Sequence, residues 1–317
     1  MGKGRVGAAE AERLAARIGN AKYLARPYSG RRDGMSVAEC VKLAAAQDRS
    51  ISMASGTMTG RDPRITMLAV YRAMNALAVR GRTVEACTLL LMVPREIPEA
   101  QLRPFMRAAY EVAELSDVEI VRADTSEVTA HVTAYGHAGE DTLAEYPEAE
   151  YSVVMCGLAG AEETLLSYEE HRERLLAKYP QHFLKDIPSL MDTLDARGYC
   201  EVAARSGAVY AYACSDGGVY AGLYGMGERL RLGMRIDLPS IPISQKSIEI
   251  CEELDIDPYR IGANGCVFFI TAEPERLLTA LYEAGAEAAV IGHLQEANAR
   301  ELHNGDEVRY LEPFRGI

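Results

Sequence analysis

The chain has 317 residues, 48% of them hydrophobic, and a formal net charge of −12 at pH 7. That length allows one large or two ordinary globular domains, and the acidic balance disfavours nucleic acid and anionic membranes as main partners. The sequence lacks the uncharged apolar run of about 18 residues that a membrane span needs. Its charged N-terminus lacks the apolar stretch of a signal peptide, so we expect a cytoplasmic protein.

The pattern of the first half predicts mixed helices and strands. Apolar residues recur at helical spacing over 65–80, and a near-continuous apolar run closed by proline over 84–94 is typical of a buried strand. Over 128–135 apolar and polar residues alternate strictly, as in a strand with one buried face. The other elements expected here are a helix at 9–18, a strand at 50–60, a helix opened by Pro98 and a strand at 118–121.

Residues 136–150 are polar, acidic and contain proline, which indicates a linker. We therefore expect two domains, at 1–140 and 151–317. Helices and strands interleave in both, but not in a strict βαβ rhythm, which favours an α+β fold with an α/β sandwich in the second domain. The elements expected after the linker are strands at 151–157, 208–214, 265–271 and 287–292, an extended segment at 235–244, and helices up to 179, at 246–254 and at 274–285.

The stretch "CSDGGVYAGLYGMGERL", residues 214–230, contains five glycines. It fits neither a Walker loop, since no lysine follows a glycine, nor a dinucleotide loop, because position 230 is leucine. A helix N-capped by Ser215 or Asp216 fits better, with an apolar stripe on one face and glycines thinning the other. Those glycines indicate close packing, which we favour, or close approach of a ligand.

The seven cysteines are scattered and form no CxxC pair, which argues against structural zinc and favours reduced, buried thiols. Cys214 allows two interpretations. A thiolate just before a helix N-terminus is stabilised and reactive, whereas a small buried residue at a strand end is inert. We favour the second interpretation.

The segment "CSDGG" before a glycine-rich helix resembles the "DxSDGG" element of the AIR synthase superfamily. The segments "RIDLPSIPISQKSIEICEELDIDPYRIGANGCVFFIT", "AAVIGHL" and "NGDEVRYLEP" are similar to the C-terminal domain of its AIR synthase-related, hydrogenase maturation factor-like group. In the first half "MNALAVRG", "TLLLMVP" and "VRADTSEV" are similar to the N-terminal domain. The resemblance covers about residues 5 to 313, and the superfamily also includes thiamine-monophosphate kinase and selenophosphate synthetase.

The resemblance implies a homodimer in which the N-terminal sheets pair into a barrel, with ATP and Mg²⁺ at the N-terminal domain and a small-molecule substrate. It places nucleotide-binding residues at Asp33, Asn75, Asp124 and Thr125 and at 216–218, that is Asp216, Gly217 and Gly218. Of these, Asp33 and Asp124 would be the metal ligands. The implied chemistry is phosphorylation of a carbonyl or amide oxygen, or of the substrate directly.

The chain departs from the family where acids are expected. Arg32 precedes Asp33 in the first loop, Gly56 stands for the acid of the second motif, and Ala76 follows Asn75 where the family has aspartate. The chain ends "EPFRGI", without the C-terminal cysteine of the carbamoyl-carrying enzyme.

Two hypotheses follow. The chain is a relative with a degraded Mg-ATP site and weak or absent ATP chemistry, which we favour slightly; or it is an active ATP-dependent enzyme that phosphorylates a carbonyl or amide oxygen or a small molecule. Each site residue alone also has a plain structural interpretation, as a turn, cap or surface residue.

Overall fold

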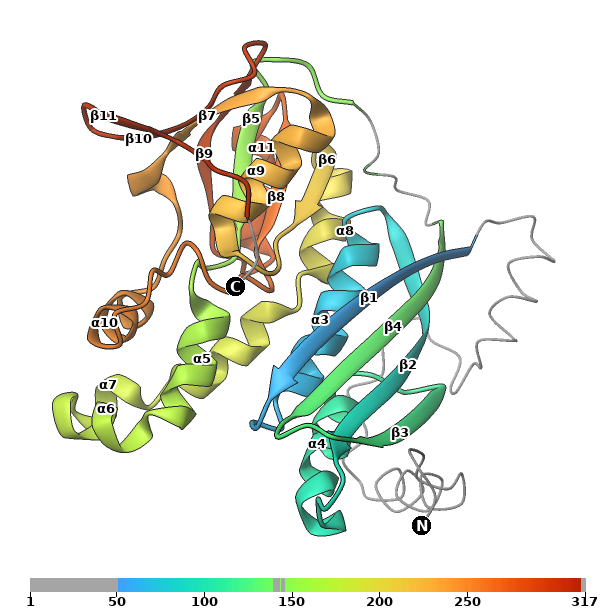
Figure 1. The fold of residues 1–317 in the computed structure, drawn as a ribbon. Helices are drawn as coiled ribbons and strands as arrows, with labels where there is room; N and C mark the ends of the chain where they lie inside the picture. The colour runs from blue at the N-terminus through green and yellow to red at the C-terminus, as the bar shows by residue number, and fades with distance from the viewer. Residues whose placement is uncertain (1–50, 139–142, 144–145, 315–317) are drawn as a thin grey trace. The chain divides into compact units, whose positions relative to one another are not determined.

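The structure is a computed structural model that describes residues 51–138, 143 and 146–314 (Figure 1). The helix expected at 9–18 and the loop carrying Asp33 lie outside the described residues. Among the residues that are described, no helix is both long and apolar enough to cross a membrane.

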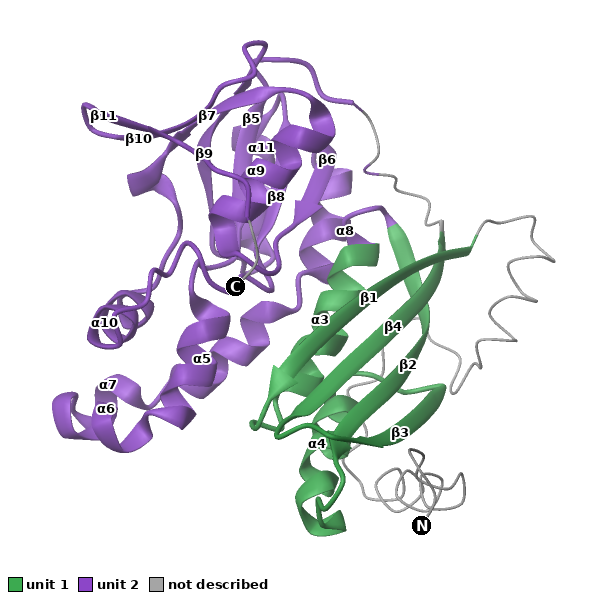
Figure 2. Ribbon diagram, in the orientation of Figure 1, with its two compact units in different colours: residues 1–77, 82–139 green, residues 78–81, 140–317 purple. Residues whose placement is uncertain are grey.

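The chain divides into two compact units (Figure 2). Unit 1 comprises residues 1–77 and 82–139, and unit 2 comprises residues 78–81 and 140–317. Each unit has its own sheet, so each is described by itself.

Unit 1 is built on a four-stranded sheet in the order β1-β4-β2-β3, in which β2 and β3 are parallel and the other neighbours antiparallel. Helices α3 and α4 pack on one face, and the Thr66 hydroxyl of α3 donates a 2.7 Å hydrogen bond to the Phe105 carbonyl of α4. The elements are β1 (Ile51–Gly60), α3 (Ile65–Ala78), β2 (Arg82–Pro94), α4 (Glu99–Val112), β3 (Asp117–Ala123) and β4 (Val128–Ala138).

The predicted alternation along β4 is confirmed, because its small apolar side chains are buried against the helices. The polar side chains of the same strand lie on the opposite face, where the Thr57 hydroxyl of β1 hydrogen-bonds His131 Nδ1 over 2.8 Å. The helix predicted over 65–80 and the strand predicted over 84–94 are likewise observed, as α3 and β2. The buried side chains of β4 are Val128, Ala130, Val132 and Ala134.

At Gly56, α3 comes very close to the backbone of β1. A Cβ atom at this position would lie 2.3 Å from the Ala69 carbonyl oxygen and 2.6 Å from Arg72 Cβ. The Arg72 guanidinium then reaches back along the strand and donates to the Thr57 carbonyl over 3.2 Å. The helix therefore rests directly on the backbone of β1.

Unit 2 contains a seven-stranded mixed sheet in the order β11-β10-β7-β9-β5-β8-β6. Its elements are β5 (Ser152–Cys156), α5 (Ala161–Glu170), α6 (Arg172–Lys178), α7 (Gln181–Leu184), a 3-10 helix (Ile187–Leu194), α8 (Arg197–Arg205), β6 (Ala208–Ala213), α9 (Gly218–Leu230), β7 (Gly233–Asp237), a 3-10 turn (Leu238–Ser240), α10 (Gln245–Glu253), β8 (Val267–Thr271), α11 (Pro274–Glu283), β9 (Ala288–Gln295), β10 (Arg300–Asn304) and β11 (Glu307–Tyr310).

Both faces of this sheet are covered. On one face α9 packs through Leu223 and Met226 against Phe268 and other apolar residues of the central strands. On the opposite face α8 and α11 pack against Val154 and Phe269. The unit is a helix–sheet–helix sandwich, which confirms the predicted α+β fold class.

The helix of the glycine stretch begins later than predicted. Gly217, in the left-handed conformation at φ 77°, is its N-cap residue, so the expectation that Ser215 or Asp216 holds that position is wrong. Gly218 follows at φ 75°. The chain therefore enters α9 through two consecutive residues in a positive-φ conformation, which glycine adopts readily and other residues rarely do. The predicted apolar stripe is confirmed, because Val219, Leu223, Met226 and Leu230 are all buried.

The interior glycines of α9 admit neighbouring groups. A Cβ at Gly222 would lie 2.7 Å from Cys214 Sγ, one at Gly225 2.5 Å from the Tyr212 hydroxyl, and one at Gly227 2.5 Å from Arg300 Nε. The Arg300 guanidinium also sits over the Tyr224 ring, 4.5 Å from its centroid. Close packing, the favoured interpretation, thus accounts for all three positions.

Several elements of unit 2 are not anticipated by the sequence pattern. Helix α8 and the β10–β11 hairpin are too short or too polar to stand out. The segment expected to be extended over 235–244 is a strand only to Asp237, after which Leu238–Ser240 forms a 3-10 turn with Pro239 in its first turn.

Replacing Gly56 tests the contact between α3 and β1. Gly56→Ala should destabilise unit 1 by about 1–3 kcal/mol, because the methyl group must displace the Ala69 carbonyl or the strand. Urea unfolding followed by circular dichroism measures the change. Ser55→Ala, on the exposed face of the same strand, should change the unfolding free energy by no more than about 0.5 kcal/mol; equal effects of both variants would contradict the close contact.

Candidate functional site

Asp124 and Thr125 lie in the loop that joins β3 to β4. The Asp124 carboxylate accepts a 2.7 Å bond from Arg95 Nη2, in an ion pair whose side chains are 79% and 61% exposed. Thr125 Oγ1 donates to the Glu127 carbonyl and accepts from the Glu127 N–H, so it stabilises the turn. In this structure both residues make local protein contacts at the end of the sheet.

Asn75 lies elsewhere in unit 1. It is a buried residue of α3, with 2% of its surface exposed. Ala73, on the same helix, lies against Gly56 of β1, which pairs with Val132 of β4. From Val132 back to the start of β4, beside the Asp124 loop, four strand residues span about 13 Å. Metal–oxygen bonds are about 2–2.6 Å long, so within one chain Asn75 and Asp124 do not converge on one ion.

The positions expected to carry further acids have no carboxylate. Ala76 follows Asn75 on α3. At Gly56 the space that a side chain needs is filled by the Ala69 carbonyl and Arg72 Cβ. The missing acid therefore cannot be restored at position 56 on this backbone.

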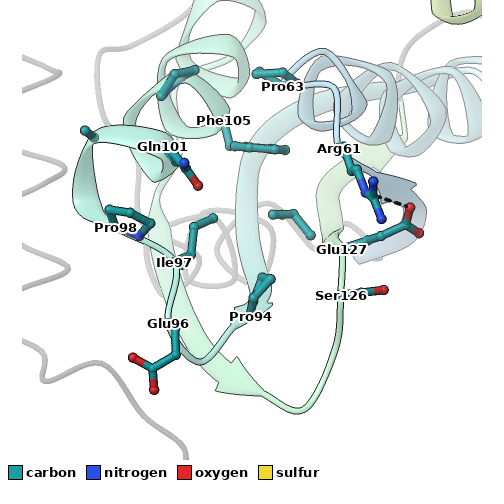
Figure 3. A pocket seen from close by; sticks show the side chains of 13 residues that line it. Arg61, Pro63, Pro94, Glu96, Ile97, Pro98, Gln101, Phe105, Ser126 and Glu127 are labelled. Carbon is teal, nitrogen blue, oxygen red and sulfur yellow. Dashed lines mark ion pairs between the residues drawn. The ribbon is translucent and has the colours of Figure 1, made fainter. Parts of the chain in front are cut away.

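A pocket of about 660 Å³ lies beside the Asp124 loop, between the β2–α4 connection and the start of β4 (Figure 3). Its walls are mainly apolar, and its polar groups include Gln101 and Ser126. At one side of the mouth Arg61 Nε and Glu127 Oε1 form an ion pair at 3.6 Å. The apolar wall is formed by Pro63, Pro94, Ile97, Pro98, Ala100, Pro104, Phe105 and Val128.

Sequence reasoning missed this pocket. The available signal was Pro94 at the end of β2 and Pro98 before α4. Proline fixes φ, so it restricts the conformation of the connection between the two elements. Those prolines were interpreted only as boundaries of elements.

Asp216, Gly217 and Gly218 lie in unit 2 at the start of α9. Asp216 is exposed. A Cβ at Gly218 would lie 2.4 Å from the Tyr259 carbonyl oxygen, and one at Gly217 2.6 Å from the Phe314 ring. The loop after α10 and the C-terminal tail thus close over this turn.

A second open pocket, of about 550 Å³, adjoins the same turn. Tyr220 stacks on Tyr259 at 5.4 Å there, and the Arg260 guanidinium lies over the Tyr220 ring. Burial, with Asp257 nearby, raises the pKa of Tyr220 to about 12, so its hydroxyl stays protonated at neutral pH. The pocket contains Gly217 of the predicted set but not Asp216 or Gly218.

The described cysteines are buried thiols. Cys214 is 4% exposed, and burial raises its pKa well above the ordinary value, which disfavours the thiolate. The inert interpretation of Cys214 is thereby supported. Within 51–138, 143 and 146–314, three or more histidine, cysteine or acidic side chains nowhere gather as a metal site would require.

Comparison with known proteins gives the class of the chain. Residues 170–303 match the family described as AIR synthase related protein, C-terminal domain. The fold of 98% of the chain superimposes on 98% of E. coli HypE, with a TM-score of 0.73 at 17% identity. A HypE in complex with ATP gives a TM-score of 0.68 at 14% identity over 98% of this chain and 97% of that one. The chain therefore has the fold of HypE, and residues 170–303 of its second unit are similar to the AIR synthase-related C-terminal domain.

In sequence the chain is similar to hydrogenase maturation proteins of the HypE type. It is 24% identical to the carbamoyl dehydratase HypE of Rhizobium leguminosarum over 248 residues, which cover 73% of this chain and 68% of the relative. It is 26% identical to a putative hydrogenase expression/formation protein of Methanocaldococcus jannaschii over 247 residues, 72% and 70% of the two chains.

Thiol labelling tests the burial of the cysteines. In a Cys40→Ser variant, the six remaining thiols, which are all buried, should react with Ellman's reagent only on unfolding, because the native thiols are covered and protonated. Absorbance should rise by six equivalents in urea and by fewer than one without it. Rapid native labelling that a further Cys214→Ser substitution removes would show that Cys214 is reactive.

Proposed function

We propose that this protein is a HypE-like member of the superfamily, a cytoplasmic homodimer whose Mg-ATP site is degraded and whose ATP chemistry is weak or absent. The observation that carries the proposal is Gly56, where the Ala69 carbonyl occupies the place of an acidic side chain. In this proposal residues 1–140 form the nucleotide and dimerisation domain and 151–317 the C-terminal domain. The proposal does not specify the small-molecule substrate.

The charges around the remaining acid support the loss. Mg²⁺ binds through hard oxygen ligands, usually one or two carboxylates together with phosphates. The Asp124 carboxylate is taken by Arg95, whose neighbour in space, Arg122, donates to the Arg95 carbonyl over 2.7 Å. A metal at Asp124 would have to share the carboxylate with the Arg95 guanidinium, which repels a cation, and in this proposal Asp33 alone would supply a second carboxylate.

The alternative is an active ATP-dependent enzyme that phosphorylates a carbonyl or amide oxygen or a small molecule. The existence of a HypE structure in complex with ATP on the same fold favours it. In that case Asp33, Asn75, Asp124 and Thr125, with residues 216–218, would hold the nucleotide, and Asp33 and Asp124 the Mg²⁺.

Calorimetry separates these functions. Titration of the full chain with Mg-ATP, and with ATP in EDTA, should give no metal-dependent heat at micromolar protein, because too few carboxylates remain to hold the ion. The Asp124→Asn variant should then behave like the parent. Micromolar binding that needs Mg²⁺ and that Asp124→Asn weakens at least tenfold would establish the active enzyme instead.

The open face of the sheet in unit 1 supports the homodimer. On β1 and β4 this face carries neither acidic side chains nor lysine or arginine; Met53 is 60% exposed, and Thr59 hydrogen-bonds Thr129 at 2.9 Å. In an isologous interface the same surface of two copies packs together about a twofold axis. An uncovered sheet face without repelling charges is compatible with such packing. The face is formed by Met53, Ser55, Thr57, Thr59, Thr129, His131, Thr133 and Tyr135.

Light scattering tests the dimer. At micromolar concentration the parent should have twice the mass of the 34.6 kDa chain. Met53→Glu and Thr133→Glu, each placing a charge on both copies of the face, should shift the mass towards one chain, because like charges would be buried together. Thr279→Glu, on the solvent-exposed side of α11, should leave the mass unchanged. A monomeric parent would contradict the proposal.

A further inference from the structure

The pocket beside the Asp124 loop has the size and lining of a small-molecule site. Sites for small ligands enclose about 300–1,000 Å³ and combine apolar walls with a few polar groups, and this pocket has about 660 Å³. Figure 3 shows Pro98, Ile97 and Pro94 along one side, and Phe105 between Gln101 and Pro63. Proline and phenylalanine rings present flat apolar surfaces, which suit a flat ring.

The charged groups of the pocket disfavour an anion. Arg61, its single cation, pairs with Glu127 at 3.6 Å. Glu96 adds a second carboxylate at the edge away from that pair. Two acids against one paired base leave a net charge of −1 along the lining, which would repel a phosphate group.

The polar groups of the pocket are mostly acceptors. Pro104, inside α4, has no N–H, so the Ala100 carbonyl lacks its normal helical donor, and both residues line the pocket. The carboxylates of Glu96 and Glu127 also accept, and the Gln101 amide can do either. A ligand that satisfies these groups must bring N–H donors.

We propose that this pocket binds an uncharged, flat heteroaromatic ring that carries N–H or amino donors. The apolar rings of the lining stack on the ligand, and the Ala100 carbonyl with the Gln101 amide orients its donors. This site goes beyond the proposed function, because it requires neither Mg²⁺ nor a phosphate group and stands whether or not ATP binds elsewhere.

The free base 2-aminopurine is a suitable probe, because it is flat, uncharged, amino-bearing and fluorescent, and the chain contains no tryptophan to interfere. With the full chain, its anisotropy should rise with a dissociation constant of about 0.1–1 mM, as expected of so small a ligand. The 5′-triphosphate of 2-aminopurine riboside, with or without Mg²⁺, should bind at least tenfold more weakly.

Two matched variants locate the binding. Ala100 is exposed on α4 and lines the pocket, so Ala100→Phe should fill it and weaken 2-aminopurine at least tenfold. Glu111→Phe, on the same helix but outside the lining, should bind within twofold of the parent. Circular dichroism confirms that both variants fold.

The proposal is overturned if 2-aminopurine gives no anisotropy change, if Ala100→Phe binds it as well as Glu111→Phe does, or if the triphosphate binds more tightly than the base. A Mg²⁺-dependent preference for the triphosphate that Asp124→Asn abolishes would also overturn the degraded ATP site. Failure of the base alone leaves that proposed function intact, so the two failures are distinguishable.

Discussion

The contact between α3 and the backbone of β1 at Gly56 sets the architecture of the first unit. Because no side chain separates them, the Ala69 carbonyl and Arg72 Cβ rest against the strand, and the Arg72 guanidinium is held against the Thr57 carbonyl. The helix thereby covers one face of the sheet closely and leaves the other face to small polar side chains. A side chain at position 56 and this depth of packing exclude one another, because its Cβ would lie 2.3 Å from the Ala69 carbonyl oxygen.

Two ion pairs lie at the end of the unit 1 sheet that is next to the pocket. Arg95 pairs with Asp124 and Arg61 pairs with Glu127, so each of these carboxylates has a guanidinium partner. Both pairs are partly or well exposed, and exposed pairs contribute little to folding, of the order of 0–1 kcal/mol. Their effect is on the local potential, which they bring close to neutral beside an apolar pocket.

Much of the fold could be predicted, because the spacing of the apolar residues along the sequence matches the spacing of the buried positions on each helix or strand. The stripe in α3, the alternation in β4 and the buried strand β8 follow from it, whereas α8 and the β10–β11 hairpin are short and polar and depend on tertiary contacts. The predicted start of α9 is wrong because propensity favours serine or aspartate as an N-cap, while the contact with the Tyr259 carbonyl requires glycine at Gly218.

The distances between the predicted site residues could not be predicted from the sequence, because they depend on how the elements pack. Asn75 and Asp124 are distant because α3 runs away from the loop, which no motif spacing reveals, and the pocket is formed by residues from three separate segments of the chain.

The prolines of the pocket in unit 1 also affect how readily it can be occupied. Pro63, Pro94, Pro98 and Pro104 each fix one backbone torsion and cannot relax into alternative shapes. A lining of this kind loses little conformational entropy when a ligand arrives, so more of the interaction energy appears as affinity. The pocket is then preorganised: small molecules that complement the unliganded cavity should bind with little adjustment of the protein.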